Sequence, residues 1–185
     1  MFERLLARIA DALDAAGIPY MVIGGQAVLV HGEPRLTGDI DVTVDVRLDE
    51  VARLQSGIED LGLDVLVDVA TFTRDTHVVP CRDPATGIRV DFVLATSPYE
   101  RGALARACGV LIGTRHVRFT SAEDLVIHKL LGGRPRDLDD ARGILLKHPA
   151  LDHVLIRRWL CEYGPALGKP LEELFQALLR DPHGE

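Results

Sequence analysis

The chain has 185 residues, of which 47% are hydrophobic and 26% charged, as is typical of a globular protein with one substantial core. Acidic residues outnumber basic ones by 28 to 21, and the net charge of -7 argues against a broad electrostatic grip on nucleic acid, although a local basic patch stays open. No apolar run approaches the roughly 20 residues that span a bilayer, so we expect a cytoplasmic protein without membrane contact. The cysteines Cys81, Cys108 and Cys161 are too scattered for a zinc knuckle or a disulfide framework, and we expect them to be reduced.

The amino-terminal segment predicts a helix, a strand and a second helix. Apolar residues recur at helical spacing over residues 2–13 with charges between them, which predicts an amphipathic helix instead of a secretory segment. Residues 20–23 predict a short buried strand that ends at Gly24 and Gly25. The following QAVLVHG suits one or two helical turns.

The next strand is the clearest element of the chain. In DIDVTVD, three apolar residues alternate with acids and a threonine, so one face is apolar and the other carries oxygen atoms. After it, the pattern predicts a helix over 48–61, strands over 63–70, 77–80 and 88–95, a helix over 99–107 and two strands over 109–119.

From Thr120 onward the pattern becomes helical. Capping-box spacing links Ser121 with Asp124, or alternatively Thr120 with Glu123. We expect helices over about 121–132, 136–147, 151–163 and 170–180. The predicted fold class is therefore α/β (α+β), with a mixed-sheet core at 1–119 and a helical subdomain at 120–185 packed on it.

Three aspartates are candidates for chemistry. Asp39 and Asp41 are two apart on a strand, so they share a face, with Cα atoms roughly 6.5 to 7 Å apart. Asp91 lies inside another predicted strand and joins them if the two strands are neighbours. Three such carboxylates would suit hard cations and two-metal phosphoryl chemistry, with Asp91 placed to help deprotonate an acceptor hydroxyl. On spacing alone, a solvated strand face is the simpler explanation.

Gly24 and Gly25 favour a metal and phosphate site over a solvated strand face, because they lie between a strand and a helix. Glycines there permit close backbone approach, and the helix N-terminus offers amide donors to an anion. An ordinary strand-to-helix turn is the competing explanation. Neither a Walker motif nor G-x-G-x-x-G is present, which argues against the common nucleotide-binding loops.

Taken together, these motifs resemble a known superfamily. The order GG, thirteen intervening residues, DIDV and later VDFV resembles the DNA polymerase β-like nucleotidyltransferases. Within them, GGQAVLVHG with RLTGDIDV, and later EDLVIHKLLGGRPRDLDDARGIL, resembles the AbiEii-like and related small bacterial nucleotidyltransferases. The likeness covers most of residues 20–145.

The resemblance implies a nucleotidyltransferase fold and a magnesium-dependent enzyme that moves an NMP from an NTP to an acceptor, releasing pyrophosphate. Two Mg²⁺ ions are expected, with Mn²⁺ as an alternative. It implies metal binding and catalysis by Asp39, Asp41 and Asp91, and phosphate binding by Gly24 and Gly25. It further assigns to nucleotide binding the residues that match the family's KL and R-D-x-x-D patterns: Lys129, Arg136, Asp137 and Asp140.

Simpler explanations remain for several of these residues. Lys129 and Arg136 also fit solvated helix charges, and acids such as Asp137 favour a helix N-terminus. Asp137 and Asp140 share a helical face, from which they could orient Lys129 or Arg136. We interpret His31 as a packed or capping residue, since no second histidine stands at metal spacing.

Two classes of function fit the sequence. The first is an active nucleotidyltransferase whose acceptor is a small molecule, a tRNA or a protein; one form of it is the toxin of a toxin–antitoxin pair, with an antitoxin as partner. The alternative is a catalytically inactive module of the same fold that binds a nucleotide or a partner. The net charge argues against RNA as the acceptor, whereas a local basic patch formed by Arg134, Arg136, Arg142 and Lys147 would favour it.

Overall fold

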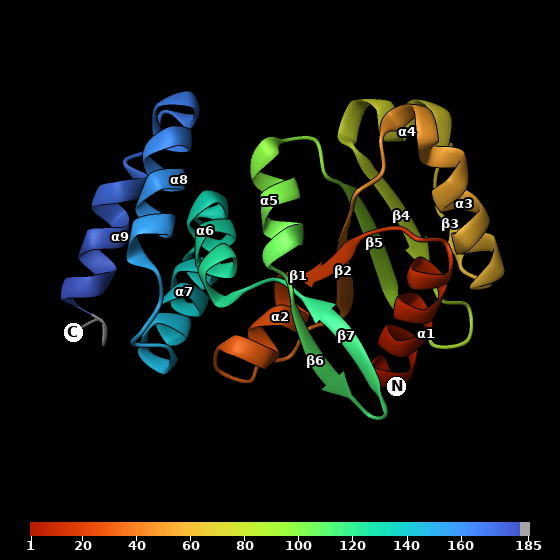
Figure 1. Cartoon of the computed structure of the whole chain (residues 1–185), viewed down its shortest axis with the longest axis horizontal. Coiled ribbons are helices and arrows are strands. Elements are labelled where there is room, and N and C mark those ends of the chain that lie inside the picture. The colour runs from red at the N-terminus through yellow and green to blue at the C-terminus, as the bar shows by residue number, and fades with distance from the viewer. Residues whose placement is uncertain (182–185) are drawn as a thin grey trace. The chain divides into compact units, whose positions relative to one another are not determined.

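The computed structural model describes residues 1–181, and the chain divides into two compact units (Figure 1). The first unit comprises Met1–Gln26 and Leu36–Thr120. The second unit comprises Ala27–Arg35 and the chain from Ser121 onward. The segment Ala27–Arg35 thus groups with helices that lie far from it in the sequence.

A mixed β-sheet forms the centre of the first unit. Within the described residues it has seven strands in the order β3-β4-β5-β2-β1-β7-β6. The pairs β2/β5 and β1/β7 are parallel, and the other neighbours are antiparallel. The strands are β1 (Tyr20–Ile23), β2 (Asp39–Val44), β3 (Asp64–Val65), β4 (Val78–Arg82), β5 (Arg89–Leu94), β6 (Cys108–Ile112) and β7 (Arg115–Phe119). This sheet with flanking helices confirms the predicted fold class.

Amphipathic helices cover the sheet of the first unit. The helix α1 (Phe2–Ala15) packs on β7 and on α3 through a stripe that includes Leu5, Ile9 and Leu13, each at most 2% exposed. Apolar residues at a period of 3.6 produce this stripe, as the sequence predicts. The other helical elements are α2 (Gly24–His31), which continues into the second unit, the 3₁₀ turn η1 (Leu48–Glu50), α3 (Val51–Asp60), α4 (Val69–Thr76) and α5 (Pro98–Arg106).

The strand expected over residues 63–70 is wrong for most of its length. Only β3 is extended, and α4 begins at Val69. Asp68 accounts for the difference, because its carboxylate accepts a hydrogen bond from the Thr71 amide at 2.9 Å and so caps the helix. The alternating valines and leucine of this segment resemble a strand, but the capping aspartate between them starts a helix.

Within the described residues, the second unit consists of helices, the turns between them and the segment 32–35. Besides the end of α2, the helices are α6 (Ala122–Gly132), α7 (Pro135–Lys147), α8 (His153–Leu167) and α9 (Leu171–Arg180). Of the two capping options, the structure has Ser121, whose hydroxyl accepts from the Asp124 amide at 3.1 Å. Gly133 ends α6 in the left-handed conformation at φ 66°. No helix in the described part of the chain is long and apolar enough to cross a membrane.

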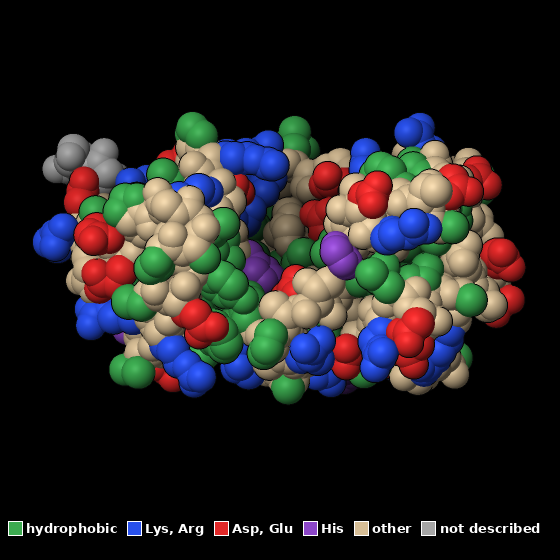
Figure 2. Space-filling view, turned by 90° about the horizontal axis from the view of Figure 1, so that it is seen from above, with side chains coloured by type: hydrophobic (Ala, Val, Ile, Leu, Met, Phe, Trp, Pro, Cys, Tyr) green, Lys and Arg blue, Asp and Glu red, His purple; other side chains and the backbone are tan. Residues whose placement is uncertain are grey.

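The surface carries charges of both signs. On the face shown in Figure 2, Lys and Arg side chains are interspersed with Asp and Glu side chains and with single hydrophobic residues. On this face, therefore, no large area carries charges of one sign alone.

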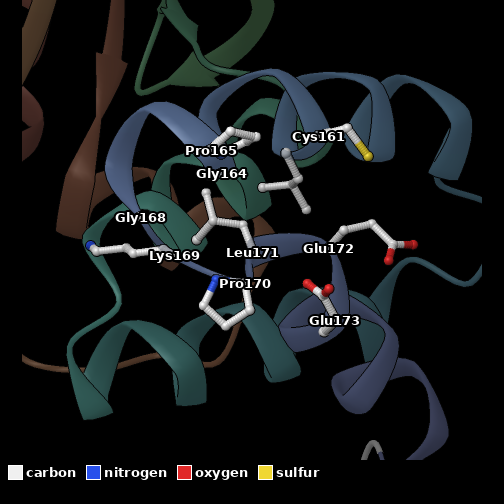
Figure 3. A pocket seen from close by; sticks show the side chains of 10 residues that line it. Cys161, Gly164, Pro165, Gly168, Lys169, Pro170, Leu171, Glu172 and Glu173 are labelled. Atoms are coloured by element: carbon white, nitrogen blue, oxygen red, sulfur yellow. The ribbon is translucent and has the colours of Figure 1, made fainter.

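A cavity of about 550 Å³ lies in the second unit where α8 turns into α9 (Figure 3). Gly164 allows the backbone at Lys169 to pack against α8, because a Cβ added to Gly164 would lie only 3.0 Å from the Lys169 carbonyl oxygen. The Lys169 ammonium donates to the Leu131 carbonyl oxygen at 2.9 Å. Of the described residues that line the cavity, Lys169 is the only basic one, and this hydrogen bond occupies it. The rest of the lining is mainly proline, glycine and leucine, with Glu172 and Glu173, so we assign no catalytic or binding role to the cavity.

Candidate functional site

Three carboxylates share one face of the sheet in the first unit. Asp39 and Asp41 lie two residues apart on β2, whereas Ile40 between them is fully buried on the opposite face. The strand β5 runs parallel to β2, with Asp91 directly opposite Asp41. Neighbouring strands are about 5 Å apart and alternate residues about 7 Å, so the three acids occupy a small area of the sheet. The structure thus brings together the three acids that the sequence singles out.

The turn between β1 and α2 lies against Asp41. β1 ends at Ile23, which is paired with Asp41, and α2 begins at the next residue. Gly24 has φ 64°, a conformation that favours glycine, and a Cβ added to it would overlap the Asp41 carboxylate oxygen Oδ2 and lie 3.0 Å from Cγ. A side chain at this position therefore does not fit beside the carboxylate.

Gly25 occupies an equally tight place beside Thr37. A Cβ on Gly25 would overlap the Thr37 hydroxyl and lie 2.8 Å from the Thr37 Cβ. That hydroxyl donates to Asp39 Oδ1 at 3.0 Å, and the Gln26 side chain donates to the Asp39 carbonyl oxygen at 3.3 Å. Both glycines of the pair are thus needed for the acids of β2 to lie close to the β1–α2 turn.

Asp91 is held by an arginine of its own strand. Arg89 Nε lies 2.9 Å from Asp91 Oδ1 and 3.0 Å from Oδ2. Its hydrogen bond to Asp91 and the negative charge of that carboxylate raise the pKa of Arg89, with smaller contributions from Asp39 and Asp41. Burial raises the pKa of the nearby Cys81 thiol to about 12, and the charge of Asp91 adds to this effect. Cys81 is therefore a neutral packing residue.

The chemistry of this donor set fits a hard divalent cation, because Mg²⁺ prefers carboxylate oxygens and the three acids lie on adjacent strands. Within residues 1–181, no three His, Cys, Asp or Glu side chains are gathered closely enough to ligate one ion. Arg89 engages Asp91, and Thr37 engages Asp39. Binding of a cation would therefore require these side chains to rearrange.

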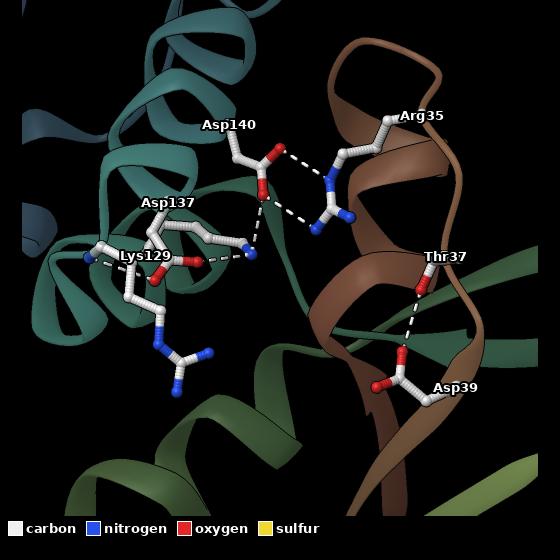
Figure 4. A network of polar contacts seen from close by, with 7 residues as sticks. Arg35, Thr37, Asp39, Lys129, Asp137 and Asp140 are labelled. Atoms are coloured by element: carbon white, nitrogen blue, oxygen red, sulfur yellow. Dashed lines mark hydrogen bonds and ion pairs between the residues drawn. The ribbon is translucent and has the colours of Figure 1, made fainter.

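The predicted residues of the helical region form a separate network in the second unit. Lys129 Nζ lies 2.8 Å from Asp140 Oδ2 and 3.1 Å from Asp137 Oδ1, and the lysine is only 7% exposed. Arg35 forms a bidentate ion pair with Asp140, at 2.8 and 3.0 Å (Figure 4). Two cations and two carboxylates thus neutralise one another, as a buried charge cluster requires. The nucleotide-binding role of Lys129 stays a prediction.

The remaining basic residues of this region are partly engaged. Arg136 is exposed on α7. Arg142 pairs with Asp139 at 3.1 Å, and Lys147 donates to the Gly32 carbonyl oxygen at 2.7 Å. His31 is buried, with its ring 5.6 Å from that of His148 in an edge contact, which agrees with our interpretation of a packed residue.

Sequence patterns identify the acids more readily than their partners. Arg89 is missed, although its position two residues before Asp91 places it on the same strand face, and this spacing could have revealed it. The Arg35–Asp140 pair joins residues 105 positions apart, and no local pattern predicts it. Gln26 likewise gives no signal in the sequence as a neighbour of Asp39.

No family model and no curated protein matches this sequence. Solved structures do resemble it. The solution structure of the antibiotic-resistance factor ANT(2'')-Ia superposes with a TM-score of 0.61 and 18% identity over 90% of this chain and 95% of that one. An antigenic nucleotidyltransferase-like protein from Paracoccidioides brasiliensis gives 0.58 and 16%, covering 92% and 91%. The lincosamide antibiotic adenylyltransferase LnuA gives 0.53 and 16%, covering 76% and 94%. At these identities the likeness establishes the fold, which is that of nucleotidyltransferases.

Proposed function

We propose that this protein is a nucleotidyltransferase that moves a nucleoside monophosphate from an NTP to an acceptor hydroxyl and releases pyrophosphate. The observation that carries the proposal is the register of β2 with its two neighbours, which sets Asp41 opposite Asp91 on β5 and beside the Gly24 turn that follows β1. The fold shared with ANT(2'')-Ia and LnuA supports it.

Each residue of the site has a role in this reaction. Two Mg²⁺ ions, or Mn²⁺, held by Asp39, Asp41 and Asp91 would supply Lewis-acid stabilisation of the triphosphate charge. The glycine turn brings the backbone close to Asp41 and Thr37, and the amides at the α2 N-terminus would donate to phosphate oxygens. Asp91 accepts the proton of the acceptor hydroxyl while the acceptor oxygen attacks the α-phosphorus. The bond between the α-phosphorus and the oxygen that bridges to the β-phosphate breaks, and pyrophosphate leaves.

The helical residues complete the proposal. The resemblance to AbiEii-like enzymes assigns Lys129, Arg136, Asp137 and Asp140 to nucleotide binding. Within the second unit, the two carboxylates hold the Lys129 ammonium in one orientation. In this proposal Lys129 would exchange part of its pairing with these carboxylates for a phosphate oxygen, toward which its ammonium is a compact point charge.

For the acceptor we propose a small hydroxylated molecule. Among the structural neighbours, one is described with adenylyl-2"-tobramycin and another with lincomycin. The net charge of -7 and the engagement of Arg142 and Lys147 in local contacts support a small acceptor over RNA. A toxin that modifies tRNA, paired with an antitoxin, is the other form of the proposal.

The test is a labelling assay with each α-³²P-labelled NTP, Mg²⁺, and separate small-molecule, RNA and protein fractions of a cell extract. Transfer of label into the small-molecule fraction is expected, and label in RNA would support the toxin form. Asp41→Asn should reduce transfer by about 100-fold or more, since losing about 3 kcal/mol of transition-state stabilisation has that effect. The control Asp60→Asn makes the same change at an exposed position of α3 and should leave transfer unchanged. Equal activity of the two variants would contradict the assignment.

A catalytically inactive binding module is the second candidate, favoured by the ion pair that holds Asp91 against Arg89. Calorimetry separates the two candidates. An inactive module would bind an NTP with the same affinity whether or not Mg²⁺ is present and would transfer no label with any NTP. The proposed enzyme requires binding that depends on the cation.

A further inference from the structure

Arg89 lies among the three acids of the first unit. It precedes Asp91 by two residues on β5 and is directly opposite Asp39 on β2, so its side chain leaves the same face of the sheet. Its Nε contacts both carboxylate oxygens of Asp91, at 2.9 and 3.0 Å. A guanidinium so placed occupies the lone pairs through which Asp91 would bind a cation.

The charges explain why an arginine is stable at this position. Three ionised carboxylates on adjacent positions repel one another, and a guanidinium beside them offsets part of that repulsion. The hydrogen bond to Asp91, followed by the fields of the three acids, raises the pKa of Arg89. An arginine guanidinium stays protonated in proteins, so Arg89 supplies a permanent positive charge beside the three acids.

The exposure of the Arg89 side chain indicates that it can move away from Asp91. The Arg89 side chain is 53% exposed, whereas that of Asp91 is 18% exposed. An ion pair with one exposed partner gains little, because water solvates the released guanidinium. Asp91, by contrast, is held by its place in the sheet.

We propose that Arg89 is an internal counter-ion that binds Asp91 while no divalent cation is present and is displaced from Asp91 when a cation binds. This inference rests on the proposed function, because it requires a cation at the three acids. If so, Arg89 weakens cation binding in the absence of nucleotide. The release of Arg89 from Asp91 then accompanies binding of the cation to the three acids.

Arg82 offers a matched control. It lies on β4 directly opposite Arg89, so it carries the same charge on the same face of the sheet. Its side chain is exposed and, among the described residues, has no ion pair and no hydrogen bond. Replacing Arg82 removes a nearby positive charge without removing a contact to Asp91.

The experiment is calorimetric titration of Mn²⁺ alone into the wild-type protein, Arg89→Gln and Arg82→Gln, with circular dichroism to establish that each is folded. Arg89→Gln should bind Mn²⁺ about three- to tenfold more tightly than the wild type, and Arg82→Gln less than about twofold more tightly. In NMR spectra of the wild type, Mg²⁺ should accelerate solvent exchange of the Arg89 Nε proton.

Three results would overturn the inference. Unchanged or weaker Mn²⁺ binding by Arg89→Gln would show that the arginine does not compete with the cation. An equal gain in both variants would show a general effect of charge and no role of the contact. Failure of all three proteins to bind Mn²⁺ alone would leave no cation for Arg89 to compete with and would overturn the inference, whereas the labelling assay with NTP and Mg²⁺ tests the proposed function separately.

Discussion

Replacing Gly24 by alanine should destabilise the first unit and displace the Asp41 carboxylate. Gly24 has φ 64°, where an L side chain costs about 1–2 kcal/mol. The new Cβ would also overlap Asp41 Oδ2 and lie 3.0 Å from Cγ, so the aspartate must turn away from its rotamer. Such a rotation costs about 0.5–1.5 kcal/mol. We therefore expect the free energy of unfolding to fall by about 1.5–3.5 kcal/mol.

Gly87 provides the control for the backbone contribution. It has φ 73°, and a Cβ added to it would meet nothing within 4 Å. Gly87→Ala should therefore lose only about 1–2 kcal/mol. The difference between the two glycine variants measures the contact with Asp41.

The assay is urea unfolding followed by far-UV circular dichroism, repeated for Gly24→Ala in an Asp41→Ala background. Removing the carboxylate should lower the cost of the glycine substitution toward that of Gly87→Ala. If Gly24→Ala costs no more than Gly87→Ala, or if its cost is the same with and without the Asp41 carboxylate, then the turn does not pack on Asp41 as described.

Three further predictions concern burial and charge. Asp140→Ala leaves Arg35 and Lys129 without their shared carboxylate and should lower the free energy of unfolding, measured in urea, by about 3 kcal/mol. Asp139→Ala on the same helix should change that free energy by less than about 0.5 kcal/mol. Equal effects of the two substitutions would contradict the network. Because burial raises the pKa of Cys81 to about 12, a thiol reagent at pH 8 should modify only the two exposed cysteines of the folded protein, and all three in urea; fast modification of the third in the native state would contradict its burial. Burial raises the pKa of Tyr20, so its neutral form is favoured in the folded state, and the stability that it contributes is complete below pH 10 and lost as pH rises through the folded value. Tyr20→Phe should flatten the alkaline part of the stability curve, and an unchanged slope would count against this reasoning.

Local patterns predict most elements of the fold because they depend on short-range geometry. The alternation of Ile40 and Val42 with acids specifies a strand with one buried face, and the helical spacing of α1 specifies its packed stripe. The same reasoning fails at residues 63–70, where apolar alternation competes with the cap formed by Asp68. In this segment only Asp64 and Val65 pair with a neighbouring strand, so most of the rest gains no sheet hydrogen bonds from an extended conformation. The cap at Asp68 is therefore enough to favour a helix there.

The candidate site divides in the same way. The sequence by itself determined that Asp39 and Asp41 share a face and that two glycines stand between a strand and a helix, because each statement concerns neighbours along the chain. Only the tertiary structure decided that Asp91 lies opposite Asp41 and that Arg89 holds it. It also decided that Gly24 packs on the Asp41 carboxylate. These contacts depend on strand order and register, which are set by packing between distant segments and leave no local periodicity to read.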